Sequence, residues 1–189
     1  MWRKRGEAAK PELSGDDPYA DQIPLSRAVP LWGGISEKGF EAITFHKKKK
    51  LDGKEWAEAA GGLRQAIRKL KHSRRGPYRL ICDNEAFLTA RDARPMHRRL
   101  NVELVSIPAR SPDLNPIERF WGWLRKQLRL KDLRDLRDGR PGLGKMAYKA
   151  RVRAFLKTQR AQNAAKRQWS SLKSVCKIVI KKRGAASGK

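Results

Sequence analysis

The sequence predicts an α/β fold with at least one parallel pair of strands. Short apolar runs typical of strands alternate with stretches of helical periodicity through the middle of the chain. Such alternation favours a sheet covered by helices. The composition then changes, because residues 139–189 hold fifteen Lys and Arg and no acidic residue. We therefore expect an α/β domain over residues 1–138 and a basic helical tail over residues 139–189, disordered at its end.

The N-terminal part of the chain predicts two strands and a helix after an irregular start that carries four prolines. Residues 28–36 and 39–46 are expected to be strands joined by a tight turn. Residues 54–71 place apolar side chains at helical spacing, although Gly61-Gly62 weaken this helix. These elements form the first part of the predicted sheet and its cover.

The middle of the chain places a carboxylate at the end of a predicted strand. Residues 77–84, "PYRLICDN", form a short apolar run that contains Asp83 near its end and is typical of a buried strand. A helix with a break near Pro95 is expected over residues 85–100, followed by a strand over residues 101–109. Asp83 is therefore expected at the carboxyl edge of the sheet.

The segment "LNPIERFWGWLRKQL" (residues 114–128) predicts the start of an amphipathic helix. Pro116 suits its first position and Asn115 its N-cap. Glu118 then has two interpretations. It can complete a capping box by accepting the N–H of Asn115. Alternatively it can meet Asp83 at the sheet edge, because the thirty-four residues between them provide a helix, a strand and a turn. Two such carboxylates are suitable ligands for Mg²⁺ at a phosphate backbone.

The charge balance favours a polyanionic partner. The 189 residues include 45 Lys and Arg against 19 Asp and Glu, which gives a net charge of +26. A globular protein this basic is typical of nucleic-acid binding. A highly charged, disordered chain is the alternative, but 39% hydrophobic residues and six tryptophans argue against it for most of the chain.

Cysteine usage and hydropathy exclude several other classes of protein. Neither Cys82 and Cys176 nor the three histidines have the spacing of a zinc site. No apolar run approaches the ~20 residues of a membrane span, and no signal peptide opens the chain. We expect reduced thiols, no membrane contact, and a nuclear location in a eukaryote or a cytoplasmic one otherwise.

Four short motifs carry a family resemblance: "WRKRGE" (2–7), "LWGGIS" (31–36), "CDN" (82–84) and "SPDLNPIERFW" (111–121). Together they resemble the mariner-type DDE transposases, in the branch whose last catalytic carboxylate is Glu. The likeness runs from Trp2 to about Gln127. It implies an RNase H-like mixed sheet flanked by helices, DNA as the partner, and a homodimer as an assembly of the family. It also implies Mg²⁺- or Mn²⁺-dependent DNA cleavage and strand transfer, with Asp83 and Glu118 as the second and third catalytic carboxylates and metal ligands.

The sequence also differs from the family pattern in one respect. The first catalytic Asp of the family lies a short way upstream of the motif that here begins at residue 2. Asp16, Asp17 and Asp21 fall on its other side and are expected to be solvated loop acids. The strand that carries the first Asp is central in an RNase H-like sheet, so its absence should leave two unpaired edges. We expect a partial catalytic domain, shortened at its N-terminal end and not a competent transposase alone.

Basic residues supply the candidate DNA contacts, which are Lys47, Lys48, Lys49, Lys50, Arg119 and Arg125, together with the tail. The lysine run can also be a solvated loop. Two other functions remain open. One is a non-catalytic DNA-binding protein derived from a transposase. The other is an unrelated RNA-binding protein, which the lack of an RNA-module signature disfavours.

Overall fold

The computed structural model describes residues 28–45, 51–70, 76–109 and 111–184. The motif at residues 2–7, the three early acids, the run from Lys47 to Lys50 and the last five residues lie outside these ranges. The chain divides into two compact units. The larger contains Pro30–Trp121 and the residues from Phe155 on, and the smaller contains Gly122–Ala154. The boundary that we expect after Asp138 stays a prediction.

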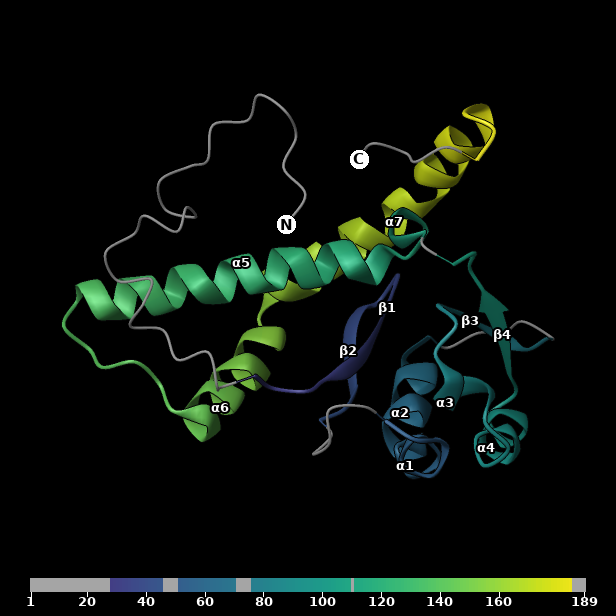
Figure 1. The fold of residues 1–189 in the computed structure, drawn as a ribbon, viewed down its shortest axis with the longest axis horizontal. Coiled ribbons are helices and arrows are strands. Elements are labelled where there is room, and N and C mark those ends of the chain that lie inside the picture. The colour runs from purple at the N-terminus through teal and green to yellow at the C-terminus, as the bar shows by residue number, and fades with distance from the viewer. Residues whose placement is uncertain (1–27, 46–50, 71–75, 110, 185–189) are drawn as a thin grey trace. The chain divides into compact units, whose positions relative to one another are not determined.

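An antiparallel hairpin opens the larger unit. Its strands are β1 (Trp32–Ser36) and β2 (Gly39–Thr44), with Ile35 opposite Phe40. Gly39 has a φ of +113° at the turn, a backbone conformation that residues with a Cβ rarely adopt. The hairpin is the one expected from the sequence, with shorter strands (Figure 1).

A parallel pair of strands follows, as the alternation of strands and helices predicts. It consists of β3 (Tyr78–Cys82) and β4 (Val102–Ser106), with Leu80 opposite Leu104. Two short helices connect these strands, α3 (Ala86–Thr89) and α4 (Arg94–Arg99). The single broken helix expected here is thus two separate helices, and Pro95 lies in the first turn of the second one, where a missing N–H costs nothing.

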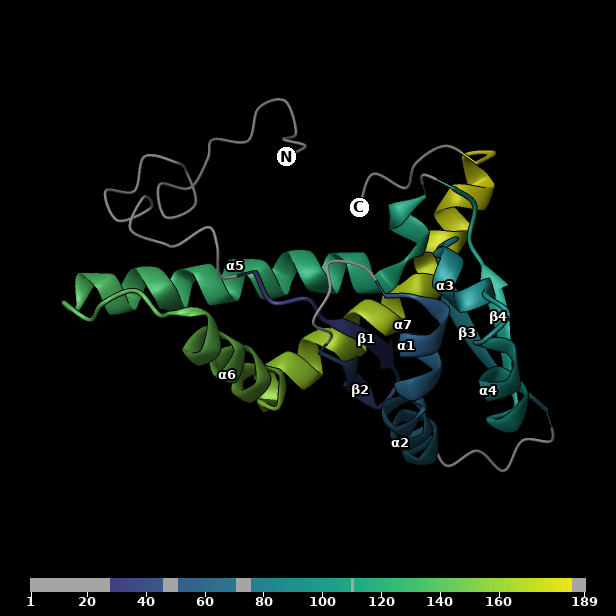
Figure 2. The ribbon, with the colours of Figure 1, turned by 60° about the horizontal axis from the view of Figure 1, so that its bottom comes forward.

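The two strand pairs belong to separate sheets. β1 pairs with β2, β3 pairs with β4, and no described strand joins β1 to β3 (Figures 1 and 2). An antiparallel and a parallel pairing are therefore both present among the described residues. The missing first strand and the two unpaired edges that it would leave stay a prediction, because residues 1–27 lie outside the described ranges.

Apolar packing around Trp56 joins the two strand pairs. Trp56 lies on α1 (Gly53–Glu58), has no exposed surface, and contacts the ring of Trp32 with centroids 4.4 Å apart. The surrounding cluster includes Ile43 from β2 and Cys82 from β3. Burial of apolar surface on this scale is the main favourable contribution to folding. The hydrophobic cluster thus holds β2 and β3 in one unit.

The helix expected over residues 54–71 is divided into α1 and α2 (Ala60–Leu70). Asp52 and Glu55 form a capping box at the start of α1, and the division falls at Ala59. α2 packs on β2. Gly62 makes this contact close, because a Cβ there would overlap the carbonyl oxygen of Ile43. Of the two glycines that weaken the helical pattern, Gly62 therefore serves the packing of the helix on the strand, whereas Gly61 has open space around it.

The rest of the chain contains two long helices, α5 (Pro116–Arg137) and α7 (Gln159–Lys181). α7 packs on β1 and β2. Its Gln162 side chain accepts from the Phe40 N–H at 3.0 Å and donates to the Phe40 carbonyl at 3.3 Å. The Phe40 ring stacks on Phe120 of α5 with centroids 5.0 Å apart. Phe40 therefore connects the hairpin to both helices.

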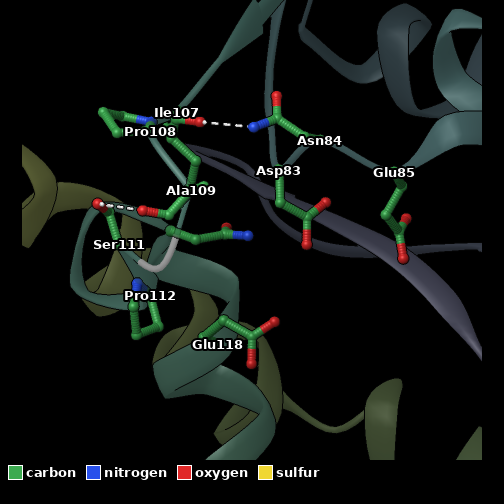
Figure 3. Close-up of a pocket in the computed structure, with 10 residues that line it drawn as sticks. Asp83, Asn84, Glu85, Ile107, Pro108, Ala109, Ser111, Pro112 and Glu118 are labelled. Carbon is green, nitrogen blue, oxygen red and sulfur yellow. Dashed lines mark hydrogen bonds between the residues drawn. The ribbon is translucent and has the colours of Figure 1, made fainter.

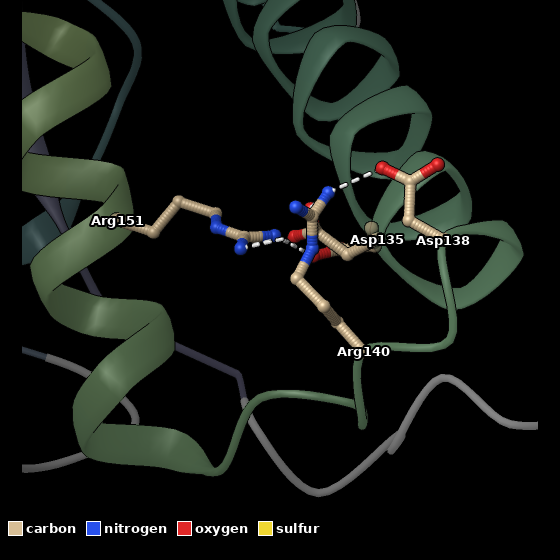
Figure 4. Close-up of polar contacts among 5 residues, drawn as sticks. Asp135, Asp138, Arg140 and Arg151 are labelled. Carbon is tan, nitrogen blue, oxygen red and sulfur yellow. Dashed lines mark hydrogen bonds and ion pairs between the residues drawn. The ribbon is translucent and has the colours of Figure 1, made fainter.

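An ion-pair network holds the smaller unit together. Arg151, on α6 (Lys145–Leu156), bonds Asp132 at 2.7 Å and also Asp135, both on α5 (Figure 4). Arg140 lies 2.5 Å from Asp135. Burial acts to raise the pKa of Asp135, but bonds and charge from Arg151 and Arg140 outweigh it, and the pKa lies below its ordinary value. The two arginines therefore keep this carboxylate ionised between α5 and α6.

Among the helices of the described residues, none combines the length and the hydropathy of a membrane span.

The Trp56–His97 hydrogen bond predicts that stability falls in mild acid. Trp56 Nε1 donates to His97 Nε2 at 2.9 Å, so this ring nitrogen must be unprotonated. Burial lowers the pKa of His97 below its ordinary value of 6.5. The unfolded chain then binds more protons between the two pKa values. This contribution to stability is therefore complete above pH 6.5 and is lost as the pH falls through the folded pKa.

We expect His97→Gln, which keeps an acceptor but does not titrate, to remove this part of the pH dependence. Urea unfolding near neutral pH and at about pH 5.5 measures the free energy of unfolding of both proteins. The original chain should lose more than the variant, with a limit of about 1.4 kcal/mol per pH unit for one proton. Equal losses in the two proteins would contradict the role given to His97.

Candidate active site

The parallel strand pair places Asp83 at its carboxyl edge. Asp83 follows the last residue of β3, as expected from the sequence. Two hydrogen bonds tie the ends of β3 and β4 together: Ile107 N–H donates to the Cys82 carbonyl at 2.9 Å, and Asn84 Nδ2 donates to the Ile107 carbonyl at 3.5 Å. The backbone that carries Asp83 is therefore held on both sides.

The segment before α5 positions Glu118. A 3₁₀ helix, η4 (Pro112–Leu114), ends at Asn115, and the Asn115 carbonyl accepts the Glu118 N–H at 3.1 Å. α7 packs against η4, and Arg119 donates to Ser171 of α7 at 2.9 Å. Glu118 thus lies in the first turn of a helix whose start is fixed by η4 and α7.

The capping-box interpretation of Glu118 is wrong. The Asn115 N–H donates to the Pro112 carbonyl at 3.2 Å, because η4 closes on it. The Glu118 carboxylate makes no hydrogen bond or ion pair with any residue that the structure describes. α5 begins at Pro116 as expected, directly after Asn115, yet the Asn115 side chain caps no N–H of a described residue. Glu118 is therefore available to a ligand.

Asp83 and Glu118 line one cavity of about 360 Å³. Figure 3 shows their carboxylates pointing toward the same space, with Asp83 coming from the strand edge and Glu118 from the helix. Both side chains are exposed. At about 30 Å³ per water molecule, the volume has room for a hydrated cation and a phosphate group. The structure thus brings together the two carboxylates that the sequence singles out.

A third carboxylate, Glu85, also lines this cavity and was not predicted from the sequence. It accepts a hydrogen bond from Trp32 Nε1 at 3.2 Å, fifty-three residues away along the chain. Its closeness in sequence to Asp83 is a signal, but nothing local indicates the bond to β1. Glu85 connects the hairpin to the edge of the parallel pair.

The edge of the cavity next to Cys82 carries negative charge from neighbouring carboxylates. Burial, followed by the charges of Asp83 and Glu85, raises the pKa of the Cys82 thiol. A raised pKa keeps Cys82 protonated, so it is a poor nucleophile and a poor metal ligand. The carboxylates beside Cys82 are therefore better suited than its thiol to bind a metal ion.

These carboxylates suit a hydrated divalent cation. No group of three His, Cys, Asp or Glu side chains that could hold a metal ion occurs within the described ranges. Mg²⁺ commonly keeps several waters and binds one or two carboxylates together with substrate phosphates. Two unpartnered carboxylates beside an open cavity fit that mode of binding, with phosphate or water completing the coordination.

The predicted DNA contacts are placed differently from one another. Arg119 is half-buried and bonds Ser171, whereas Arg125 is exposed and belongs to the smaller unit. Lys47, Lys48, Lys49 and Lys50 lie outside the described residues. All six stay predictions.

Comparison with known proteins supports the motifs. Residues 3–138 match the family described as DDE superfamily endonuclease. The Transposable element Tc3 transposase of Caenorhabditis elegans is 33% identical over 97 residues, which are 51% of this chain and 28% of that protein. The matched part thus spans less than a third of that relative.

Two solved structures share the fold. The Mos1 transposase paired-end complex with the left transposon end matches with a TM-score of 0.64 and 16% identity, over 98% of this chain and 50% of that one. The Mos1 transposase catalytic domain with raltegravir and Mn matches with a TM-score of 0.57 and 16% identity, over 88% of each chain. The RNase H-like fold class expected from the sequence is confirmed. Because the family match covers more than half of its residues, this chain belongs to the DDE superfamily endonucleases.

Proposed function

We propose that Asp83 and Glu118 hold Mg²⁺ or Mn²⁺ against a DNA phosphodiester, as the second and third carboxylates of a DDE-type site. The observation that carries this proposal is their shared cavity, in which neither carboxylate has a partner among the described residues. The ordered starts of α5 and η4 add to it, because catalysis of phosphoryl transfer depends mainly on positioning and on charge neutralisation.

Each residue has a defined part in this chemistry. A bound divalent cation would neutralise charge on the phosphate and favour attack by a water or a 3′-hydroxyl oxygen. Asp83 and Glu118 hold that charge in place from two different elements. The hydrogen bonds of Asn84 and Ile107 fix the position of the strand edge. The hydrogen bond between Arg119 and Ser171 fixes the position of the helix start.

The first test is whether divalent cations bind at these two carboxylates. We expect Mn²⁺ to raise the unfolding temperature of the chain, with a stabilisation of about 1.4 kcal/mol when free Mn²⁺ is tenfold above Kd. Asp83→Asn and Glu118→Gln should each abolish most of this shift, because each removes an anionic ligand. Glu58→Gln is the matched control, since Glu58 is exposed on α1 and does not line the cavity. Equal Mn²⁺ shifts in all four proteins would contradict the proposed site.

We further propose that residues 1–189 do not cleave DNA alone. Two carboxylates leave one ligand fewer than the DDE set requires, and none of the described residues supplies it. Supercoiled plasmid incubated with the purified chain and Mn²⁺ should therefore stay supercoiled. Metal-dependent nicking that Glu118→Ala abolishes would overturn this part of the proposal.

The exposed face of α7 is the DNA surface that we propose in the described part of the chain. Its exposed cations recur at helical spacing, and none forms an ion pair with a described residue: Lys166, Arg167, Lys173, Lys177 and Lys181. The opposite face of the helix is buried on the hairpin and on η4. A one-sided row of cations beside the segment that carries Glu118 suits the phosphates of a bound duplex.

Salt dependence tests this surface. Lys173→Ala/Lys177→Ala removes two cations one helical turn apart, and should lower the slope of log K against log salt by about 0.9 for each phosphate that is no longer neutralised. Arg64→Ala/Arg68→Ala on α2 is the matched control, since it removes the same charge at the same spacing from another exposed face. Fluorescence anisotropy of a labelled duplex at several salt concentrations measures both. Equal slopes in the two variants would argue against α7.

A non-catalytic DNA-binding protein derived from a transposase is the second candidate function. The absence of a three-ligand cluster in the described ranges favours it. It would retain the salt-dependent DNA binding of α7 but show no Mn²⁺ shift that depends on Asp83 and Glu118.

A further inference from the structure

Asn115 is a largely buried residue whose side chain lines the cavity and has no partner among the described residues. Its side chain is among the residues that line the cavity, and the residue is only 7% exposed. No hydrogen bond from its side chain to a described residue exists. The amide is not among the fully enclosed side-chain groups without a partner in the described part of the chain, so it keeps access to the cavity and can bind a ligand there.

The cavity has few donors to offer an anion. Asp83, Glu85 and Glu118 can only accept when ionised. Of the described lining side chains that can donate, Asn84 is bonded to the Ile107 carbonyl and the Ser111 hydroxyl to the Ala109 carbonyl. Asn84 keeps a second N–H, and Asn115 is the described lining residue with both side-chain N–H donors unused. A phosphodiester held beside these carboxylates needs such a donor.

We propose that Asn115 Nδ2 donates a hydrogen bond to a non-bridging oxygen of the DNA phosphodiester that Asp83 and Glu118 hold through a cation. This inference rests on the proposed function and adds a substrate-binding residue to it. Asn115 lies three residues before Glu118, and its carbonyl accepts the Glu118 N–H at 3.1 Å. The amide and the carboxylate therefore come from one rigid turn and would contact the phosphate and its counter-ion in a fixed relation.

Two variants separate this role from a metal-binding one. Asn115→Ala removes both the donor and the acceptor. Asn115→Asp keeps the shape, replaces the donor by an anionic oxygen, and keeps the variant series informative if the alanine variant folds poorly. Ser111→Ala is the matched control, because Ser111 lines the same cavity but uses its hydroxyl on a local carbonyl. Each protein is assayed for Mn²⁺ affinity without DNA, and for affinity for a labelled duplex with Mn²⁺ present.

We expect Asn115→Ala to bind the duplex about tenfold more weakly, the effect of one hydrogen bond to a charged group. Its salt slope should stay unchanged, because the substitution removes no cation. Asn115→Asp should bind DNA more weakly still, through repulsion of the phosphate. Neither should weaken Mn²⁺ binding in the absence of DNA, and Ser111→Ala should resemble the original chain in both assays.

Three outcomes would overturn or redirect the inference. Unchanged duplex affinity in Asn115→Ala overturns it while leaving the metal site of Asp83 and Glu118 intact. Weakened Mn²⁺ binding in Asn115→Ala that Asn115→Asp restores would make Asn115 a metal ligand and likewise overturn it. Failure of the original chain to bind Mn²⁺ through Asp83 and Glu118 is a different result, because it contradicts the proposed function on which the inference rests.

Discussion

The packing around Trp56 is the constraint on which the larger unit depends. The two strand pairs belong to separate sheets, so side chains rather than a backbone ladder must hold them together. Trp56 is fully buried and contacts aromatic rings from β1, α3 and α4. Cys82, the last residue of β3, belongs to the same cluster. The position of Asp83 relative to the hairpin therefore rests on apolar packing, supplemented by the bond from Trp32 to Glu85.

The parts of the site that depend on local patterns could be predicted from the sequence. Asp83 ends a short apolar run, and the parallel pairing of that run with β4 follows from the helices between them. The helix that carries Glu118 is indicated by Pro116 and by the apolar spacing after it. Thirty-four intervening residues are enough to return the chain to the same edge. The convergence of the two carboxylates was therefore predictable, because each lies at the end of a well-specified element.

What could not be predicted depends on contacts between distant residues. The capping box predicted for Glu118 does not form, because the Asn115 N–H donates to a carbonyl of η4 instead. No local sequence pattern predicts that turn. The break at Ala59 follows the packing of α1 and α2 against different neighbours, to which Gly62 contributes by its close approach to β2. The bonds from Arg151 to Asp132 and Asp135 join residues sixteen to nineteen apart on different helices. Sequence periodicity describes one element at a time and is silent on such pairs.

The separated strand pairs also bear on how molecules of this protein behave toward one another. β1 and β3 each have a strand partner on one side among the described residues, and a free strand edge is a template for pairing with another chain. Molecules with a net charge of +26 repel one another, and this repulsion opposes such pairing. Salt screens this repulsion and a polyanion neutralises it. The positive charge thus also opposes pairing of the strand edges between molecules, and concentrated, salt-rich solutions weaken this opposition.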